Sequence, residues 1–363
     1  MRVKLEDVCE RGSSNLKQSD IIDANGDYPI YGAAGYIGNV DFYHQDKPYV
    51  AVVKDGAGIG RTTLHPAKSS VIGTMQYLLP KENVLPEYLC YVVRYMHLEK
   101  YFTGATIPHI YFKDYKNEQF NLDSLERQEE IVDILGKCER VIASREDELQ
   151  KLDELVKARF VELFGDIISN EKRWTKYALS DISGSRLGKM LDAKQQTGEH
   201  RHPYLANFNV QWFRFDFSQL NEMDFNEADR KEFELQEGDL LVTEGGEVGR
   251  CAVWKNEIPS CYFQKALHRV RCDKQIILPE YLAWWFKQHA DYNSFEDVVG
   301  GKTSIPHLTG VKLKNLMVVV PDMTLQRQFV DFSKQVDKSK VAVQKALDET
   351  QTLFDSLMQE YFG

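Results

Sequence analysis

The chain has 363 residues, 43% of them hydrophobic and 28% charged, which is typical of a globular protein with two or three domains. It contains no run of 18 or more apolar residues and begins without an apolar stretch, so we expect neither a transmembrane helix nor a secretory signal. The formal net charge of −10 argues against strong unaided binding to nucleic acid, although potential depends on where the charges lie. Six cysteines without a C-x-x-C pair predict reduced thiols and a cytoplasmic location.

Residues 1–123 are predicted to form a first globular domain. The apolar segment 49–53 reads as a buried strand that ends in a glycine-containing turn. The sequence Leu-Pro-Glu at 85–87 predicts the start of a helix, because proline suits the first helical turn. A loop rich in Gly, Thr, Pro and His follows this helix and leads to the next element.

Residues 124–165 are predicted to form one long helix. Asp123 and Glu126 resemble a capping box, and Gly165 is a natural stop. Apolar residues recur at alternating spacings of three and four, which is the period of a coiled coil. The predicted seam consists of Ile131, Leu135, Cys138, Ile142, Leu149, Leu152, Val156 and Leu163.

The second half repeats the order of the first. Residues 85–89 recur at 278–282, residues 107–109 at 305–307, and residues 164–165 at 362–363. Two looser matches pair Gly56, Gly60 and Arg61 with Gly245, Gly249 and Arg250, and Leu125, Arg127 and Gln128 with Leu325, Arg327 and Gln328. Matches in the same order along the chain indicate an internal duplication. We therefore predict a second domain at 166–320, with a strand at 239–243, and a second long helix at 321–363.

The second helix has the same spacing of apolar residues. Its predicted seam consists of Phe329, Val336, Val343, Leu347, Phe354, Leu357 and Tyr361. Neither helix can bury its seam alone, so we expect the two to pair antiparallel. The predicted fold class is α+β, with two globular α/β domains separated by two long antiparallel coiled-coil helices in a pseudo-two-fold duplication. The alternative is that each helix packs on its own domain.

Motifs for catalysis are missing from the sequence. Residues 300–304 resemble a phosphate-binding loop, but Glu296 stands where that motif needs a glycine. Residues 56–60 resemble a dinucleotide-binding loop with the wrong glycine spacing, and are better explained as a turn between strands. No zinc-protease, serine-hydrolase or amino-methyltransferase motif occurs, and the nine histidines lack metal-ligand spacing. We expect a protein that is not an enzyme and holds no metal.

With these features together, the chain resembles the specificity subunit of type I restriction-modification systems over its whole length. In the second half, residues 202–205, 235–246 and 248–250 are similar to the family's recognition-domain pattern. In the first half, residues 28–32 and 35–38 are similar to another form of that domain, and the junctions at Leu125 and Leu325 match the family's start of the conserved helices.

The resemblance implies that each globular domain recognises one half of a bipartite, asymmetric target in double-stranded DNA. It implies that the helices set the spacer and bind two methyltransferase subunits, which carry S-adenosylmethionine, and that two motor and restriction subunits add ATP-driven translocation and cleavage. No cofactor is expected in this chain, and the location expected is the prokaryotic cytoplasm, with no membrane partner.

Base edges are recognised by polar and basic side chains on loops held by a rigid scaffold. The candidates in the first domain are Lys54, Arg61, Thr62, His65, Lys68, Thr106, His109 and Lys113. The candidates in the second domain are Arg186, Lys189, Lys194, Gln195, Gln196, Asn207, Asn209, Arg214, Arg250, Lys265, His268, Lys302, Thr303 and His307.

Structural roles compete with these assignments. Arg61 and Arg250 occur in both copies, which favours a structural or phosphate-binding role, and His109 and His307 could close the junction loop instead. Residues 184–189 are unique to the second copy and are the better candidates for base contact. Two other functions are open: a scaffold that binds no DNA, which the acidic charge favours, and a divergent methyltransferase or nuclease, which binding of S-adenosylmethionine by the chain alone would reveal.

Overall fold

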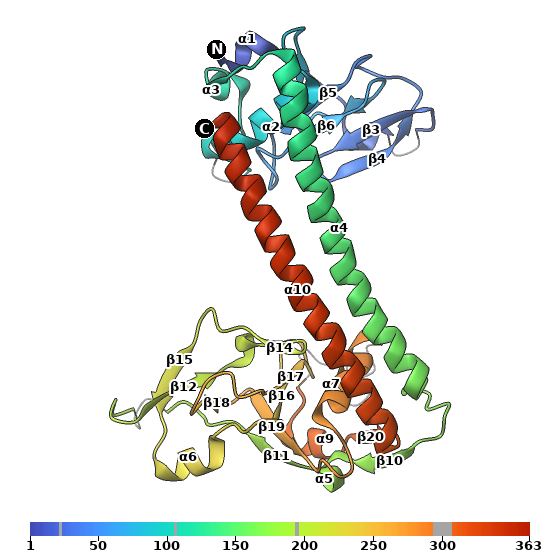
Figure 1. Cartoon of the computed structure of the whole chain (residues 1–363), viewed down its shortest axis with the longest axis vertical. Coiled ribbons are helices and arrows are strands. Elements are labelled where there is room, and N and C mark those ends of the chain that lie inside the picture. The colour runs from blue at the N-terminus through green and yellow to red at the C-terminus, as the bar shows by residue number, and fades with distance from the viewer. Residues whose placement is uncertain (22–23, 105–106, 193–195, 293–306) are drawn as a thin grey trace. The chain divides into compact units, whose positions relative to one another are not determined.

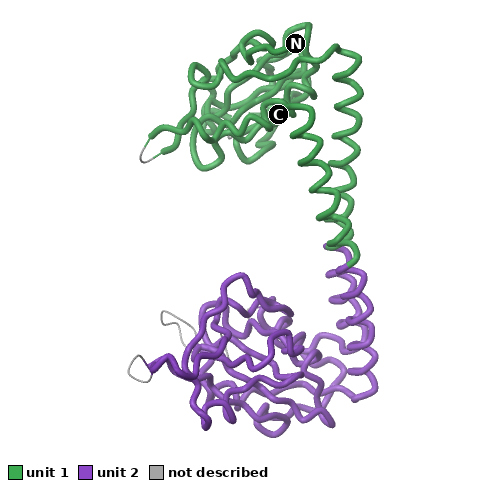
Figure 2. Tube along the Cα trace, turned by 60° about the vertical axis from the view of Figure 1, so that its left-hand side comes forward, with its two compact units in different colours: residues 1–149, 342–363 green, residues 150–341 purple. Residues whose placement is uncertain are grey.

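The computed structural model describes residues 1–21, 24–104, 107–192, 196–292 and 307–363 (Figure 1). It divides into two compact units, which we call unit 1 (Met1–Leu149 with Ala342–Gly363) and unit 2 (Gln150–Val341) (Figure 2). Each unit contains one globular domain and part of each long helix.

Unit 1 is built on two small sheets. The four-stranded sheet is antiparallel and has the order β2 (Cys9–Ser13), β8 (Met75–Pro80), β5 (Tyr49–Val53), β6 (Thr62–His65). The three-stranded sheet has the order β4 (Gly35–Val40), β3 (Tyr28–Gly32), β7 (Ser70–Val71), with β3 and β7 parallel. A separate pair joins β1 (Arg2–Lys4) to β9 (Gln119–Asn121). The helices of the domain are α1 (Leu5–Val8), η1 (Gln18–Ile21), α2 (Pro86–Tyr95), η2 (Leu98–Tyr101) and α3 (Phe112–Tyr115).

Unit 2 repeats this topology. Its four-stranded sheet has the order β11 (Ser183–Leu187), β19 (Leu267–Cys272), β16 (Leu240–Thr243), β17 (Cys251–Val253). Its three-stranded sheet has the order β15 (Asn221–Asp224), β12 (Arg201–Leu205), β18 (Tyr262–Phe263), and β10 (Thr175–Ala178) pairs with β20 (Met317–Val320). The remaining elements are α5 (Leu179–Ile182), η4 (Asn207–Asn209), β13 (Val210–Gln211), β14 (Arg214–Phe215), α6 (Glu227–Phe233), α7 (Pro279–Asp291) and α9 (Gly310–Lys314).

The sheet order confirms the predicted duplication, but two of the residue matches were wrong. The buried Gln128 accepts a hydrogen bond from the Leu85 N–H at 2.9 Å, and in unit 2 Gln326, not Gln328, accepts one from the Leu278 N–H at 2.9 Å. The two glycines with positive φ in the turn after the central strand are Gly56 and Gly60 in unit 1 and Gly246 and Gly249 in unit 2, so Gly56 corresponds to Gly246 rather than Gly245. The hydrogen bonds and backbone conformation, rather than matching residue types, therefore identify which residues of the two units correspond.

The long helices are α4 (Leu125–Phe164) and α10 (Met323–Phe362), and within each unit they lie side by side (Figure 1). In unit 1 the Arg127 guanidinium lies 5.7 Å from the centre of the Tyr361 ring. In unit 2 the rings of Phe160 and Phe329 are 5.2 Å apart. The start of each helix therefore contacts the end of the other, which is the expected antiparallel pairing. All predicted seam residues of both helices are buried or half-buried.

The ends of the long helices also pack on the globular domains, as the alternative interpretation expected. In unit 2, Phe160 and Phe164 contact Tyr281 of α7, with ring centres 5.6 and 4.8 Å apart. In unit 1, the Phe362 ring lies 5.3 Å from the Tyr88 ring of α2. The spacing rule missed these residues because they face the domain and not the seam. In each unit, one hydrophobic core is therefore shared by the domain and the two helix segments.

Gln128 and Gln326 join each long helix to the loop before α2 or α7. The Gln128 amide also donates to the Asn83 and Asp123 carbonyls, at 3.0 and 2.9 Å, and Gln326 makes the equivalent bonds to Ile276 and Pro321 at 3.1 and 2.8 Å. Both amides are fully buried.

Substitution Gln128→Leu should lower the free energy of unfolding by roughly 2–4 kcal/mol, because it leaves three backbone groups without a partner. Chemical denaturation would measure the loss. The exposed Gln150→Leu on the same helix is the matched control, with an expected change below about 0.5 kcal/mol. Equal losses for the two variants would contradict a role for the buried amide.

Candidate nucleic-acid interface

The turn that follows the central strand is built alike in both units, and its arginine is tied to the backbone. In unit 1 the Arg61 side chain donates to the Ala33 carbonyl at 2.9 Å. In unit 2 Arg250 donates to the Asn207 carbonyl at 3.1 Å and forms an ion pair with Glu247 at 3.2 Å. Both arginines therefore hold a neighbouring loop, which supports the structural role that their recurrence favoured.

The junction loop closes onto this turn in both units. The Ile110 N–H donates to the Lys54 carbonyl at 3.0 Å, and the Leu308 N–H donates to the Glu244 carbonyl at 2.8 Å. In unit 1, His109 Nδ1 lies 2.6 Å from an Asp55 carboxylate oxygen. Partial burial opposes ionisation of Asp55, but hydrogen bonds from Lys54 and His109 outweigh it and lower the pKa of that carboxyl. In unit 2, the His307 ring lies against Gly245, where an added Cβ would come within 3.1 Å of it.

Five of the predicted DNA-contacting side chains are buried in the structure, which argues against base contact for them. They are Thr62, His65, Lys189, Asn209 and His268. His65 stacks on Tyr49 with ring centres 5.3 Å apart, and burial lowers its pKa to about 4. His268 Nε2 lies 2.9 Å from the Leu308 carbonyl oxygen, and burial lowers its pKa as well. Asn209 holds the turn after η4 by donating to the Asp216 and Gln219 carbonyls, both at 2.8 Å.

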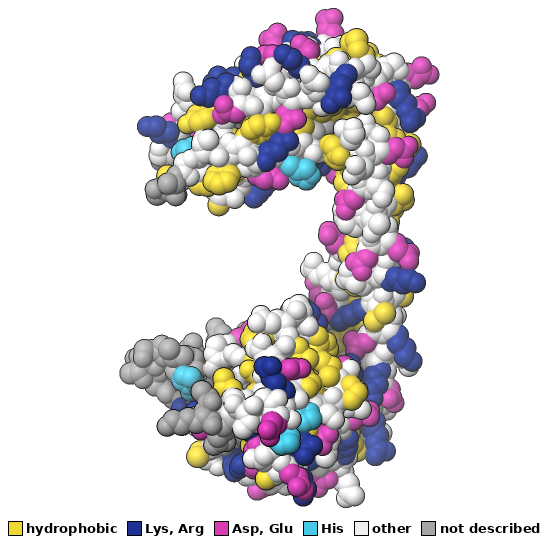
Figure 3. All heavy atoms as spheres, turned by 90° about the vertical axis from the view of Figure 1, so that its left-hand side faces the viewer, with side chains coloured by type: hydrophobic (Ala, Val, Ile, Leu, Met, Phe, Trp, Pro, Cys, Tyr) yellow, Lys and Arg dark blue, Asp and Glu magenta, His cyan; other side chains and the backbone are white. Residues whose placement is uncertain are grey.

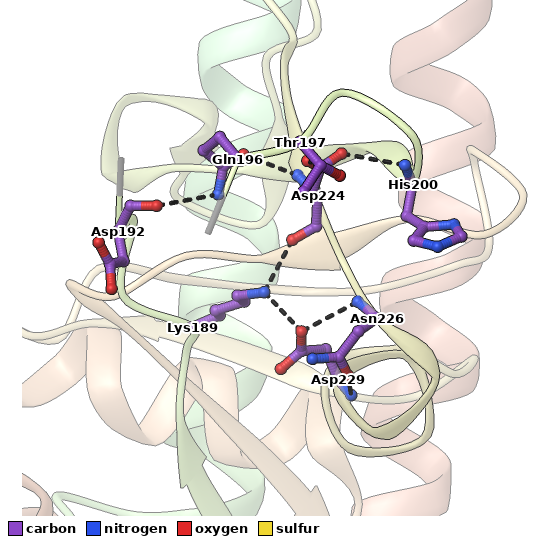
Figure 4. Close-up of polar contacts among 8 residues, drawn as sticks. All are labelled: Lys189, Asp192, Gln196, Thr197, His200, Asp224, Asn226 and Asp229. Atoms are coloured by element: carbon purple, nitrogen blue, oxygen red, sulfur yellow. Dashed lines mark hydrogen bonds and ion pairs between the residues drawn. The ribbon is translucent and has the colours of Figure 1, made fainter. Parts of the chain in front are cut away.

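Lys189 belongs to a polar network that shapes the loop between β11 and β12 (Figure 4). Its ammonium donates to the Asp224 carbonyl at 2.7 Å and to the Asp229 carboxylate at 2.5 Å. The Asp224 carboxylate in turn accepts from the backbone N–H groups of Gly198 and His200, at 2.6 and 3.1 Å. Gln196 accepts from the Asp224 N–H at 2.9 Å. Lys189 and Gln196 therefore position the loop, and their polar groups are turned inward.

Hydrogen bonds from Gly198 and its neighbours lower the pKa of Asp224. The carboxylate should therefore hold the loop firmly at any pH above the ordinary pKa of a carboxyl group, and release it in acid. The contribution is present at neutral pH and is lost as the pH falls through the lowered pKa of the folded state. We expect Asp224→Asn to speed amide exchange at Gly198 and His200 at neutral pH, and the difference from the native chain to shrink in acid. Asp216→Asn, at another turn of the same domain, should leave these two amides unchanged. An identical exchange rate in Asp224→Asn and the native chain would contradict the role of the carboxylate.

The other described candidates, apart from the two turn arginines, have side chains that are at least partly exposed. They are Lys68, Lys113, Arg186, Arg214 and Lys265 on the surface, with Lys54, Gln196, Asn207 and His109 half-buried and His307 exposed. Some have partners within the chain: Arg186 pairs with Glu232, and the Lys113 ammonium lies 5.3 Å from the centre of the Tyr111 ring. Thr106, Lys194, Gln195, Lys302 and Thr303 lie outside the described residues, as does the segment 300–304 considered as a phosphate-binding loop.

Exposed apolar side chains near the junction loop of unit 1 were missed in the sequence. Phe102, Ile107 and Tyr111 are 62%, 55% and 49% exposed, on the same loop as His109. They follow no helical or strand period, so hydrophobic patterning could not single them out. On the face drawn in Figure 3, Lys and Arg lie among Asp and Glu in both units, without one continuous basic region. Any phosphate contact on this face is therefore dispersed.

Within the described ranges, no cluster of His, Cys, Asp and Glu could hold a metal ion. Nor does any helix among these residues combine the length and apolar character that a membrane crossing requires.

Comparison with known proteins decides the family. The family model described as the type I restriction modification DNA specificity domain matches residues 1–154 and again residues 171–350. The chain belongs to this family. The double match coincides with the two copies of the fold, so the predicted resemblance is confirmed.

Relatives within the family agree with the fold. The specificity subunit of the type I restriction enzyme EcoKI from Escherichia coli (strain K12) is 25% identical over 181 residues, which are 47% of this chain and 39% of that subunit. The crystal structure of the type I restriction-modification S subunit from M. genitalium superposes with a TM-score of 0.64 at 14% identity, covering 100% of this chain and 96% of the other. A chain from a structural study of complex assembly and conformational transition of the type I system superposes with a TM-score of 0.54 at 14% identity, covering 99% of this chain and 97% of the other. At these identities the structural likeness supports the fold alone.

Proposed function

We propose that this chain recognises a bipartite DNA sequence, with one half-site for each globular domain. The observation that carries the proposal is a repeated scaffold with different loops. Both domains have the same sheet order, yet the loop between β2 and β3 in unit 1 has no counterpart of the Lys189 and Asp224 network in unit 2 among the described residues. A common scaffold with unlike loops suits two different half-sites and an asymmetric target.

We infer further that the chain carries no catalytic centre and directs partner subunits. In this proposal two methyltransferase subunits bring S-adenosylmethionine and methylate adenine, and two motor and restriction subunits bring ATP-driven translocation and cleavage, all in the prokaryotic cytoplasm. The mixed surface charge supports a role for partners in DNA binding, because partners would supply part of the phosphate contact.

Sequencing of methylated bases in cells with and without the gene tests the proposal. We expect a split adenine motif to lose its methylation when the gene is deleted, and the motif gives both half-sites directly. If the reconstituted complex binds no DNA and methylation is unchanged, the scaffold function replaces the proposed one. Binding of S-adenosylmethionine by the isolated chain would favour the enzyme instead.

A further inference from the structure

Each unit has a groove at the same place in its fold. The groove lies between the last strand of the four-stranded sheet, the helix that begins with Leu-Pro-Glu, and the long helix. We call it groove 1 in unit 1, where its volume is about 770 Å³, and groove 2 in unit 2, where its volume is about 540 Å³. Equivalent residues line both, among them Leu85 and Leu278, Glu87 and Glu280, and Asp133 and Asp331. The duplication has therefore conserved a surface as well as a core.

The two grooves carry opposite charge. Groove 1 is lined by four carboxylates and two guanidinium groups, whereas groove 2 is lined by four cationic side chains and three carboxylates. The reversal comes from the long helices, because Glu129 and Gly136 of α4 stand where α10 has Arg327 and Lys334. A basic ligand would be attracted by groove 1 and repelled by groove 2.

Groove 2 is also filled by its own side chain. The Lys334 ammonium lies 3.5 Å from the Glu280 carboxylate across the groove. Gly136 has no side chain to make the equivalent contact with Glu87. Within the described residues, neither Glu87 nor Glu129 forms an ion pair, and Arg94 is bound to Glu139 at 2.7 Å. Groove 1 therefore offers two unpaired carboxylates where groove 2 offers a closed pair.

Packing does not require a glycine at position 136. An added Cβ would lie 3.4 Å from the Arg140 side chain and 3.9 Å from the Tyr91 hydroxyl, which are ordinary contacts. Glycine inside a helix costs about 1 kcal/mol relative to alanine. The residue therefore weakens α4 without a packing reason, and its effect is that Glu87 lacks the cationic partner that Lys334 gives Glu280.

We propose that groove 1 binds a lysine or arginine side chain from a methyltransferase subunit, and that the two copies of that subunit bind this chain with unequal affinity. The inference rests on the proposed function, which supplies the partner. The apolar floor formed by Leu64, Leu85 and Val132 suits the aliphatic stem of such a side chain, and Glu87 and Glu129 suit its charged end. The same side chain from the second copy meets Arg327 and Lys334 in groove 2 and binds more weakly.

The test measures stepwise dissociation constants for the methyltransferase subunit of the same host, by titration of the full chain and native mass spectrometry. We expect two unequal steps. The double substitution Glu129→Arg and Gly136→Lys gives groove 1 the residues of groove 2 and should weaken the tighter step roughly tenfold. Glu146→Arg with Ser144→Lys, on the same helix and outside the groove, changes the charge by the same amount and is the matched control, which should change neither step.

The reciprocal substitution Arg327→Glu with Lys334→Ala should tighten the weaker step roughly tenfold, a gain that misfolding cannot produce. Two equal steps in the native chain, or unchanged steps in both double variants, would overturn the inference. The proposed DNA recognition would survive that result if the complexes still methylate a split motif. Absence of any binding by the methyltransferase subunit would overturn both.

Discussion

Exchange of the first globular domain should change one DNA half-site and leave the other intact. The domain is residues 1–123, and the donor is the first domain of another family member. The structure shows which residues must be kept, because α2 packs on the long helices through Tyr88, whose ring contacts Phe362, and Tyr91, whose hydroxyl bonds Glu139 at 2.7 Å. With Leu85, Tyr88 and Tyr91 of this chain restored in the donor, unit 1 should keep its core and only the loops should differ.

Sequencing of methylated bases in cells that carry the chimaera gives the result directly. A base mismatch costs about 1–3 kcal/mol in binding, so three or four changed positions would shift methylation completely to the new half-site. The reciprocal exchange of residues 166–320 is the control and should change only the other half. Simultaneous loss of both half-sites in a folded chimaera would contradict independent recognition by the two domains.

The fold was predictable where one physical requirement acts along the sequence. A helix that buries a narrow stripe must repeat its apolar residues every three or four positions, and the predicted helices at 124–165 and 321–363 agree with α4 and α10 to within two residues. The stripe could not reveal the second face at the helix ends, where Phe160, Phe164 and Phe362 pack on a domain. That contact depends on α2 and α7, whose position in space the local pattern does not encode.

The candidate site was predictable in its loops and much less so in its residues. The glycine turns and the junction loops were predicted, and they come together in each unit through equivalent backbone hydrogen bonds. Residue type could not distinguish a side chain that faces a ligand from one that holds a loop. Lysine and histidine are common at DNA interfaces, yet Lys189 and His268 are both buried and hydrogen-bonded to other residues of unit 2. Their partners, Asp224 and Leu308, lie far away in the sequence, so only the folded chain identifies them.

Lengthening both helices by one heptad should increase the spacer between the half-sites by about three base pairs, if the helices set the spacing as the resemblance to specificity subunits implies. Seven residues add about 10 Å to a helix at 1.5 Å each, and DNA rises 3.4 Å per base pair. Suitable insertion points follow Leu149 in α4 and Val341 in α10, at the limits of the two units. A full heptad preserves the three-and-four spacing, so Val343 and Leu347 of α10 keep their places in the seam.

The measurement is again the methylated motif, whose half-sites should stay the same while the unspecified spacer grows. Insertion into α4 alone is the informative control, because the seam residues of the inserted heptad have no partner in α10, and it should lower stability rather than lengthen the spacer. The domain exchange tests the loops, whereas the double insertion tests only the helices, so the two results are independent. An unchanged spacer in a stable double insertion would mean that the methyltransferase subunits, and not α4 and α10, fix the distance between the half-sites.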